Sequence, residues 1–128
     1  MTKPNPHTGL RHVALHIKNL EACVEFYTKL LGLKIDWQPD PDNYYLTSGN
    51  DNFALHRAPE GFEPGKYQHL DHLGFFLQAK EDVDVWHEYM IENKVTIKAA
   101  PKDHRDGTRS FYCADPDGNV VQLIWIPD

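Results

Sequence analysis

Two histidines stand at the same place in two copies of one eight-residue phrase. Residues 10–17 read LRHVALHI and residues 70–77 read LDHLGFFL, so His12 and His72 are each the third residue of their copy. Imidazole is a common metal ligand, and near neutral pH it also accepts and releases protons. The repeated histidine therefore predicts a pair of metal ligands, with a pair of hydrogen-bonded structural histidines as the alternative.

The repeat also indicates where a third metal ligand would lie. Farther along the chain the offset grows to 68 residues, which aligns FALHRAP with VQLIWIP and places Ala54 opposite Gln122. An alanine side chain binds nothing, whereas a glutamine offers a neutral amide oxygen. The candidate metal ligands are therefore His12, His72 and Gln122.

Other residues of these segments could take part in chemistry. His56 lies two residues beyond Ala54, and His16 shares the strand face of His12; either could act as a general base near neutral pH. A cationic loop, KDHRDGTRS, could bind a carboxylate or phosphate group of a substrate. Its candidate residues are Lys102, Arg105 and Arg109, and the alternative is a solvated loop.

These residues need two similar modules to position them. At an offset of sixty residues, Phe26 aligns with Trp86, so the repeat continues beyond the first strand. Two copies are too few for a solenoid, which favours one pseudo-symmetric domain. The predicted organisation is a single domain, residues 1–128, with modules 10–58 and 70–126 joined by a linker at 59–69.

Each module reads as a strand, a helix and three further strands. In the first strand, the aliphatic side chains fall on one face, while His12, Ala14 and His16 fall on the other. That second face suits a cleft between the two copies. Asn19 is the expected N-cap of the first helix, and Gly32 ends it. The predicted fold class is α+β, with helices near 19–31 and 81–92 and strands at 10–17, 33–38, 43–47, 52–58, 70–77, 94–99, 108–114 and 119–126.

Composition excludes several classes of protein. Hydrophobic residues make up 41% of the chain, charged residues 25%, and the net charge is −6. An acidic chain without a basic run argues against nucleic-acid binding. No apolar run is long enough for a membrane span, and the polar start MTKPNPHTG is not typical of a signal peptide. Two cysteines in predicted elements read as buried free thiols, and the cytoplasm is the expected location.

Three segments resemble the vicinal oxygen chelate superfamily. They are HVALHIKNLEACVEFYTKLLGLKI, HLDHLGFFL and SFYCADPDGNVVQLIWIP, and the resemblance covers about residues 10–127. The superfamily includes glyoxalase I, fosfomycin and bleomycin resistance proteins, and extradiol dioxygenases. The resemblance implies two βαβββ modules whose curved mixed sheets enclose a metal site. It places the ligands at His12, His72 and Gln122, with Ala54 at an optional fourth position.

The chain departs from this family at two positions. Family members commonly have Glu at the position of Gln122, and glyoxalase I has another Glu at that of Ala54. A neutral glutamine would hold a divalent ion more weakly, although the ion could still act as a Lewis acid. Neither residue can serve as a general base, which is why His56 and His16 are the candidates for that role.

The leading hypothesis is a metal-dependent enzyme of glyoxalase type, of the lyase or isomerase class. Its divalent ion (Zn, Ni, Mn or Fe(II)) would chelate two neighbouring oxygens of a small substrate. The alternatives are an extradiol-type ring-cleaving dioxygenase and a non-catalytic binding protein like those of bleomycin resistance. Thiol transfer of the fosfomycin type is less expected, because that group has a further segment after the last strand. The resemblance also implies a homodimer.

Overall fold

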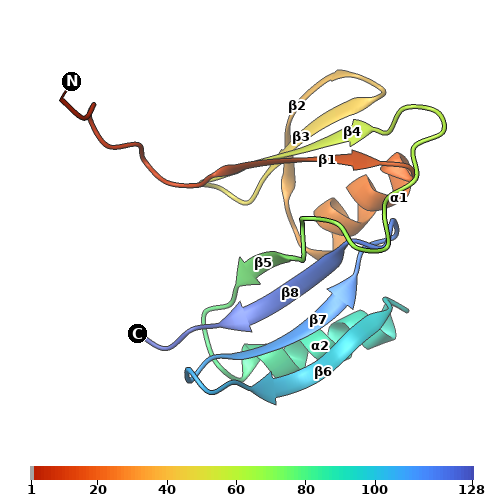
Figure 1. The fold of residues 1–128 in the computed structure, drawn as a ribbon. Helices are drawn as coiled ribbons and strands as arrows, with labels where there is room; N and C mark the ends of the chain where they lie inside the picture. Colours follow the sequence, from red (N-terminus) through yellow and green to blue (C-terminus); the bar gives the residue numbers. More distant parts are fainter. Residues whose placement is uncertain (1) are drawn as a thin grey trace.

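The computed structural model describes residues 2–128 as two four-stranded mixed sheets (Figure 1). The first sheet has the order β1-β4-β3-β2 and the second the order β5-β8-β7-β6. In each sheet the first strand of the module pairs in parallel with the last, and the other pairs are antiparallel. The predicted α+β fold of two tandem βαβββ modules is confirmed.

The elements follow the predicted order. The first module contains β1 (His12–Ile17), α1 (Leu20–Glu25), η1 (Phe26–Leu30), β2 (Lys34–Asp40), β3 (Asn43–Thr47) and β4 (Asn52–Arg57). The second contains β5 (Leu73–Phe76), α2 (Asp82–Glu92), β6 (Ile97–Asp103), β7 (Arg109–Ala114) and β8 (Val120–Trp125).

The largest differences from the predicted bounds are in β5 and β6. β5 begins at Leu73 rather than at residue 70, which leaves His72 just before the strand. β6 begins at Ile97 rather than near residue 94. Lys94 has a left-handed backbone (φ 61°), so it belongs to the turn between α2 and β6. β2 and β6 each contain a proline, Pro39 and Pro101, and each is the outer strand of its sheet. An outer strand tolerates proline, since it needs hydrogen bonds on one side only.

The first helix ends as predicted, but the hydrogen bonds at its N-terminus differ from the prediction. Gly32 has φ 80° and terminates the helix as expected. Asn19 is the N-cap residue of α1, as predicted, but its side chain makes no capping hydrogen bond. Instead, the Asp117 carboxylate of the second module accepts hydrogen bonds from the backbone N–H groups of Lys18 (3.1 Å) and Asn19 (2.9 Å). A carboxylate is favourable at a helix N-terminus, and this one also joins the two modules.

One hydrophobic core unites the two modules. Tyr27 of η1 is fully buried, and its ring centroid lies 4.8 Å from that of Phe53 in the first sheet and 6.4 Å from that of Phe75 in the second. Its hydroxyl donates a hydrogen bond of 2.8 Å to Asp115. The fully buried members of the core from the two modules are Ile17, Leu20, Cys23, Leu46, Leu55, Val83, Met90, Phe111, Cys113, Val121 and Leu123.

The two cysteines are free and buried, as predicted. Burial raises the pKa of the Cys113 thiol to about 12 and raises that of Cys23 well above its ordinary range. Within residues 2–128 no helix has the length and apolar character that crossing a membrane requires.

Candidate metal site

Strand register puts Ala54 and Gln122 at equivalent positions in the two sheets. Ala14 pairs with Ala54 in the first sheet, and Gly74 pairs with Gln122 in the second. Each candidate histidine precedes the paired residue of the first strand by two positions. The position of His12 relative to Ala54 in the first sheet is therefore equivalent to that of His72 relative to Gln122 in the second.

His72 and Gln122 line the same cavity, of about 590 Å³, in the second module. The Gln122 side chain is oriented by two hydrogen bonds: its Nε2 donates to Ser110 Oγ (2.9 Å) and to Tyr112 Oη (3.0 Å). Its Oε1 lies over Gly74, where a Cβ atom would be 3.7 Å away. With both acceptors on the nitrogen side, the oxygen remains as the group available to a ligand.

His72 is oriented in a comparable way. Its Nδ1 lies 2.7 Å from Asp71 Oδ2, and its ring meets the Tyr112 ring edge-on at 5.3 Å. Since the carboxylate accepts, Nδ1 donates, and in the neutral imidazole the lone pair is on Nε2. Metal-binding histidines commonly have such an oxygen partner on their second nitrogen.

His12 has the same type of partner but lies in the other sheet. Its Nδ1 donates to Asn52 Oδ1 at 2.6 Å, and the residue is exposed. It is not among the residues that line the cavity of His72 and Gln122. Among residues 2–128, no group of three or more His, Cys, Asp or Glu side chains is placed to hold a metal. One chain thus brings two of the three candidate ligands together and leaves the third on a separate face.

The cationic loop contributes two of its three candidate residues to the cavity. Lys102 and Arg105 line it, together with His104. Arg109 is instead bound to two carboxylates, with Nη2 2.7 Å from Asp84 Oδ1 and Nη1 3.1 Å from Asp103 Oδ1. The hydrogen bond to Asp84 holds the pKa of Arg109 above its ordinary range, and the same bond lowers the pKa of Asp84.

The two candidate bases have different surroundings. His56 Nδ1 is 2.6 Å from Asn43 Oδ1, and its ring meets Tyr45 edge-on at 5.7 Å. His16 contacts Phe62 of the linker at 5.8 Å and lines another cavity, of about 550 Å³. Both project from the face of the first sheet opposite its core side chains.

Sequence reasoning missed the residues that orient these groups. They are Asn43, Asn52, Asp71, Ser110 and Tyr112. Only Asp71, which precedes His72, carried a local signal. The others come from neighbouring strands, and their roles depend on register.

Comparison with known proteins assigns the family. The Glyoxalase/Bleomycin resistance protein/Dioxygenase superfamily matches residues 9–123. The chain belongs to this superfamily. Its fold is also that of a lactoylglutathione lyase from Agrobacterium tumefaciens, with a TM-score of 0.77 at 20% identity over 94% of this chain and 96% of that one.

Two curated relatives of this superfamily member carry different activities in their names. Metallothiol transferase FosB from Staphylococcus epidermidis is 28% identical over 91% of this chain and 80% of its own length. A trivalent organoarsenical cleaving enzyme from Bacillus sp. is 31% identical over 89% of this chain and 71% of its own length. The relatives therefore do not agree on a substrate.

Proposed function

We propose that this protein is a metal-dependent enzyme of glyoxalase type whose divalent ion is held by His12, His72 and Gln122. The observation that supports the proposal is the shared cavity of His72 and Gln122. Hydrogen bonds orient both side chains, so that the imidazole Nε2 and the amide Oε1 are the atoms available to coordinate a metal. Two imidazoles and one oxygen suit Zn, Ni, Mn or Fe(II). The bound ion would act as a Lewis acid toward two neighbouring oxygens of a small substrate.

We propose that a second copy of the chain supplies His12, so that the active form is a homodimer. His12 is exposed on a sheet face that also carries Trp37, with 59% of its surface accessible, next to Tyr45. Phe76 of the second module, the last residue of β5, is 76% exposed. Pairing the first module of one copy with the second module of another would cover both aromatic side chains and complete the ligand set.

The proposed substrate is small and carries an anionic group. Lys102 and Arg105 border the cavity, and within residues 2–128 neither is bound to a carboxylate as Arg109 is, which makes them suitable for a carboxylate or phosphate. The expected compartment is the cytoplasm, where free buried thiols such as Cys23 and Cys113 are usual.

Metal titration tests this proposal. Protein purified without chelators is titrated with Zn, Ni, Mn and Fe(II) and followed by calorimetry, with bound metal measured by elemental analysis. We expect binding that is lost in His72→Ala and at least about tenfold tighter in Gln122→Glu, because a carboxylate adds the negative charge that the amide lacks. Gln68→Glu in the linker is the matched control and leaves the affinity unchanged.

Two results would contradict it. Less than about a tenth of an equivalent of metal, with no gain on addition, would favour the non-catalytic binding protein, since complete ligand sets hold metal tightly. An affinity that Gln122→Glu leaves unchanged would remove Gln122 from the ligand set. Ring cleavage by Fe(II) is the less favoured chemistry, because its usual site contains a carboxylate that this set lacks.

Thiol transfer is a second candidate, favoured by the similarity to FosB. The cavity with Lys102 and Arg105 could equally hold an anionic acceptor. Incubation of metal-loaded protein with a thiol and fosfomycin, followed by measurement of the remaining free thiol, distinguishes this activity from an isomerase, which consumes no thiol.

A further inference from the structure

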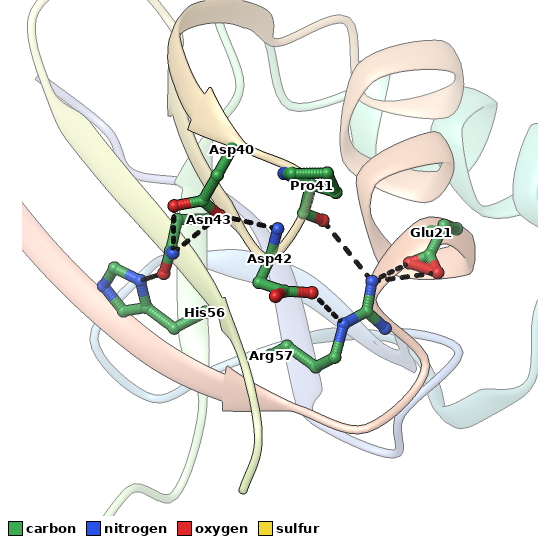
Figure 2. Close-up of polar contacts among 7 residues, drawn as sticks. All are labelled: Glu21, Asp40, Pro41, Asp42, Asn43, His56 and Arg57. Atoms are coloured by element: carbon green, nitrogen blue, oxygen red, sulfur yellow. Dashed lines mark hydrogen bonds and ion pairs between the residues drawn. The ribbon is translucent and has the colours of Figure 1, made fainter.

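The turn between β2 and β3 holds an amide in one orientation. Asn43 Nδ2 donates to both carboxylate oxygens of Asp40, at 2.9 Å and 3.0 Å (Figure 2). A carboxylate accepts hydrogen bonds and cannot donate them. The nitrogen of the Asn43 amide must therefore face Asp40, and its oxygen must face the other way, toward His56.

The orientation of Asn43 determines which nitrogen of His56 carries the proton. Asn43 Oδ1 lies 2.6 Å from His56 Nδ1. Because an amide oxygen only accepts, Nδ1 is the donor. The lone pair of the neutral imidazole is then on Nε2, on the side of the ring away from the turn.

The turn is itself fixed to the rest of the module. Arg57, the residue after His56, donates from Nε to Asp42 Oδ1 (2.6 Å) and from Nη2 to Glu21 of α1 (2.9 Å), as Figure 2 shows. Its backbone N–H also donates to the Asp42 carbonyl (2.8 Å). The hydrogen bond from Arg57 lowers the pKa of Glu21, which keeps this pair charged. These contacts hold Asn43 in place beside His56.

His56 lies in the first sheet, apart from the cavity of His72 and Gln122, and would meet the metal only in the proposed dimer, where His12 of the same chain is a ligand. It lies two residues beyond Ala54 on the same strand face, which separates the two Cα atoms by about 7 Å. Ala54 occupies in the first sheet the position that Gln122 occupies in the second. In the proposed dimer, the stretch from Ala54 to His56 would border the metal that His12 of the same chain helps to hold, and a small substrate would lie along it. His16 has no side-chain hydrogen bond among the described residues, and its ring is turned to Phe62.

We propose that His56 is the proton acceptor of this site and that Asn43, oriented by Asp40, is the positioning residue that keeps its Nε2 unprotonated and available. This rests on the proposed function. In the step, a C–H bond next to the substrate carbonyl breaks and its proton passes to His56 Nε2. The electron pair of that bond forms a C=C bond, and the π pair of the C=O bond moves onto oxygen to give an enolate. Return of the proton to carbon restores the imidazole.

The positioning role has a spectroscopic test that needs no substrate. Two-dimensional ¹H–¹⁵N spectra of the imidazole groups, recorded above the titration range of histidine, report which nitrogen is protonated. We expect wild-type His56 to show a protonated Nδ1 and a bare Nε2. Asn43→Ala and Asp40→Asn should move His56 to a mixture of tautomers, whereas the exposed controls Asn50→Ala and Asp36→Asn should not. A proton on Nε2 in the wild type, or no change in Asn43→Ala, would overturn the positioning role.

Proton exchange tests the catalytic role. Hydroxyacetone, which has a hydroxyl beside a carbonyl, is incubated in D₂O with metal-loaded protein, and the loss of its carbon-bound protons is followed by NMR. We expect His56→Ala to slow the exchange at least about a hundredfold and His16→Ala by less than about twofold. Asn43→Ala should slow it about tenfold, as loss of an orienting partner does.

The outcomes separate the two proposals. A large loss in His16→Ala with none in His56→Ala would overturn the assignment of the base, as would absence of exchange in wild-type protein that holds metal. Failure to bind metal would instead overturn the proposed function, and the tautomer spectra would still decide the role of Asn43.

Discussion

Side chains at the proposed site are each oriented by hydrogen bonds to neighbouring side chains. His12, His56 and His72 each donate from Nδ1 to an oxygen at 2.6–2.7 Å, which leaves Nε2 with the lone pair. Gln122 is oriented in the complementary way, with its nitrogen bonded and its oxygen open. Orientation by a neighbour lowers the entropy that a ligand must lose when it binds a metal.

Removal of the partners of Gln122 should therefore weaken metal binding without touching a ligand. Ser110→Ala and Tyr112→Phe each delete one acceptor of the Gln122 amide, and we expect each to lower the metal affinity about tenfold or more. Calorimetric titration with the ion that the wild type binds best measures the effect. Ser48→Ala, an exposed serine of the first module, is the control. Unchanged affinity in both variants would show that the amide needs no orientation.

At the scale of elements, the turn that joins β7 to β8 holds the modules together. The buried Asp115 carboxylate accepts hydrogen bonds from Tyr27 Oη and from the backbone N–H groups of Asp117 and Asn119. Burial and the nearby Asp115 carboxylate raise the pKa of Tyr27 well above its ordinary value. The thiol of Cys23 on α1 is held protonated by burial and by the same carboxylate.

This arrangement predicts a loss of stability at alkaline pH. In the unfolded chain Cys23 and Cys113 ionise near pH 8.5 and Tyr27 near pH 10, whereas the folded protein keeps all three protonated. Their contribution is complete below about pH 8 and is lost as the pH rises, because the unfolded state alone releases protons. Each thiol should cost about 1–2 kcal/mol of unfolding free energy at pH 10.

Urea unfolding at pH 7 and at pH 10 measures this loss. The double variant Cys23→Ala, Cys113→Ala is the control, since it should lose less unfolding free energy between the two pH values than the wild type. An equal loss in both proteins would assign the alkaline effect to other groups.

The sequence predicted the order of the elements but not the long-range contacts between them. Alternation and the repeat gave the order of every strand and helix, because each half had to bury one face of its own sheet. The N-cap position of Asn19 was predicted, but the contact of Asp117 with its backbone N–H was not, because Asp117 is almost a hundred residues away. The two bonds from Arg109 to acidic residues were likewise invisible, since Asp84 lies on α2 and meets it only in the fold.

At the scale of the molecule, the proposed metal site is divided between the two modules. His72 and Gln122 belong to the second module and His12 to the first, and the repeat alone left open whether the histidines meet within one chain or between two. A symmetric pair of chains would join unlike halves twice and create two equivalent sites.

Subunit mixing tests this arrangement. His12→Ala and His72→Ala chains, each unable to bind metal alone, are coexpressed with different tags, and the mixed dimer is isolated by two affinity steps. Light scattering should give about twice the 14.8 kDa of one chain. If the sites lie between chains, one interface combines His12 of one chain with His72 of the other, and the mixed dimer binds about one ion, against about two for the wild type. The reverse control pairs a wild-type chain with a His12→Ala, His72→Ala double variant, which leaves no complete interface and should bind none. A site within one chain gives the opposite result in both experiments, because the mixed dimer would then bind no metal and the control would bind one ion.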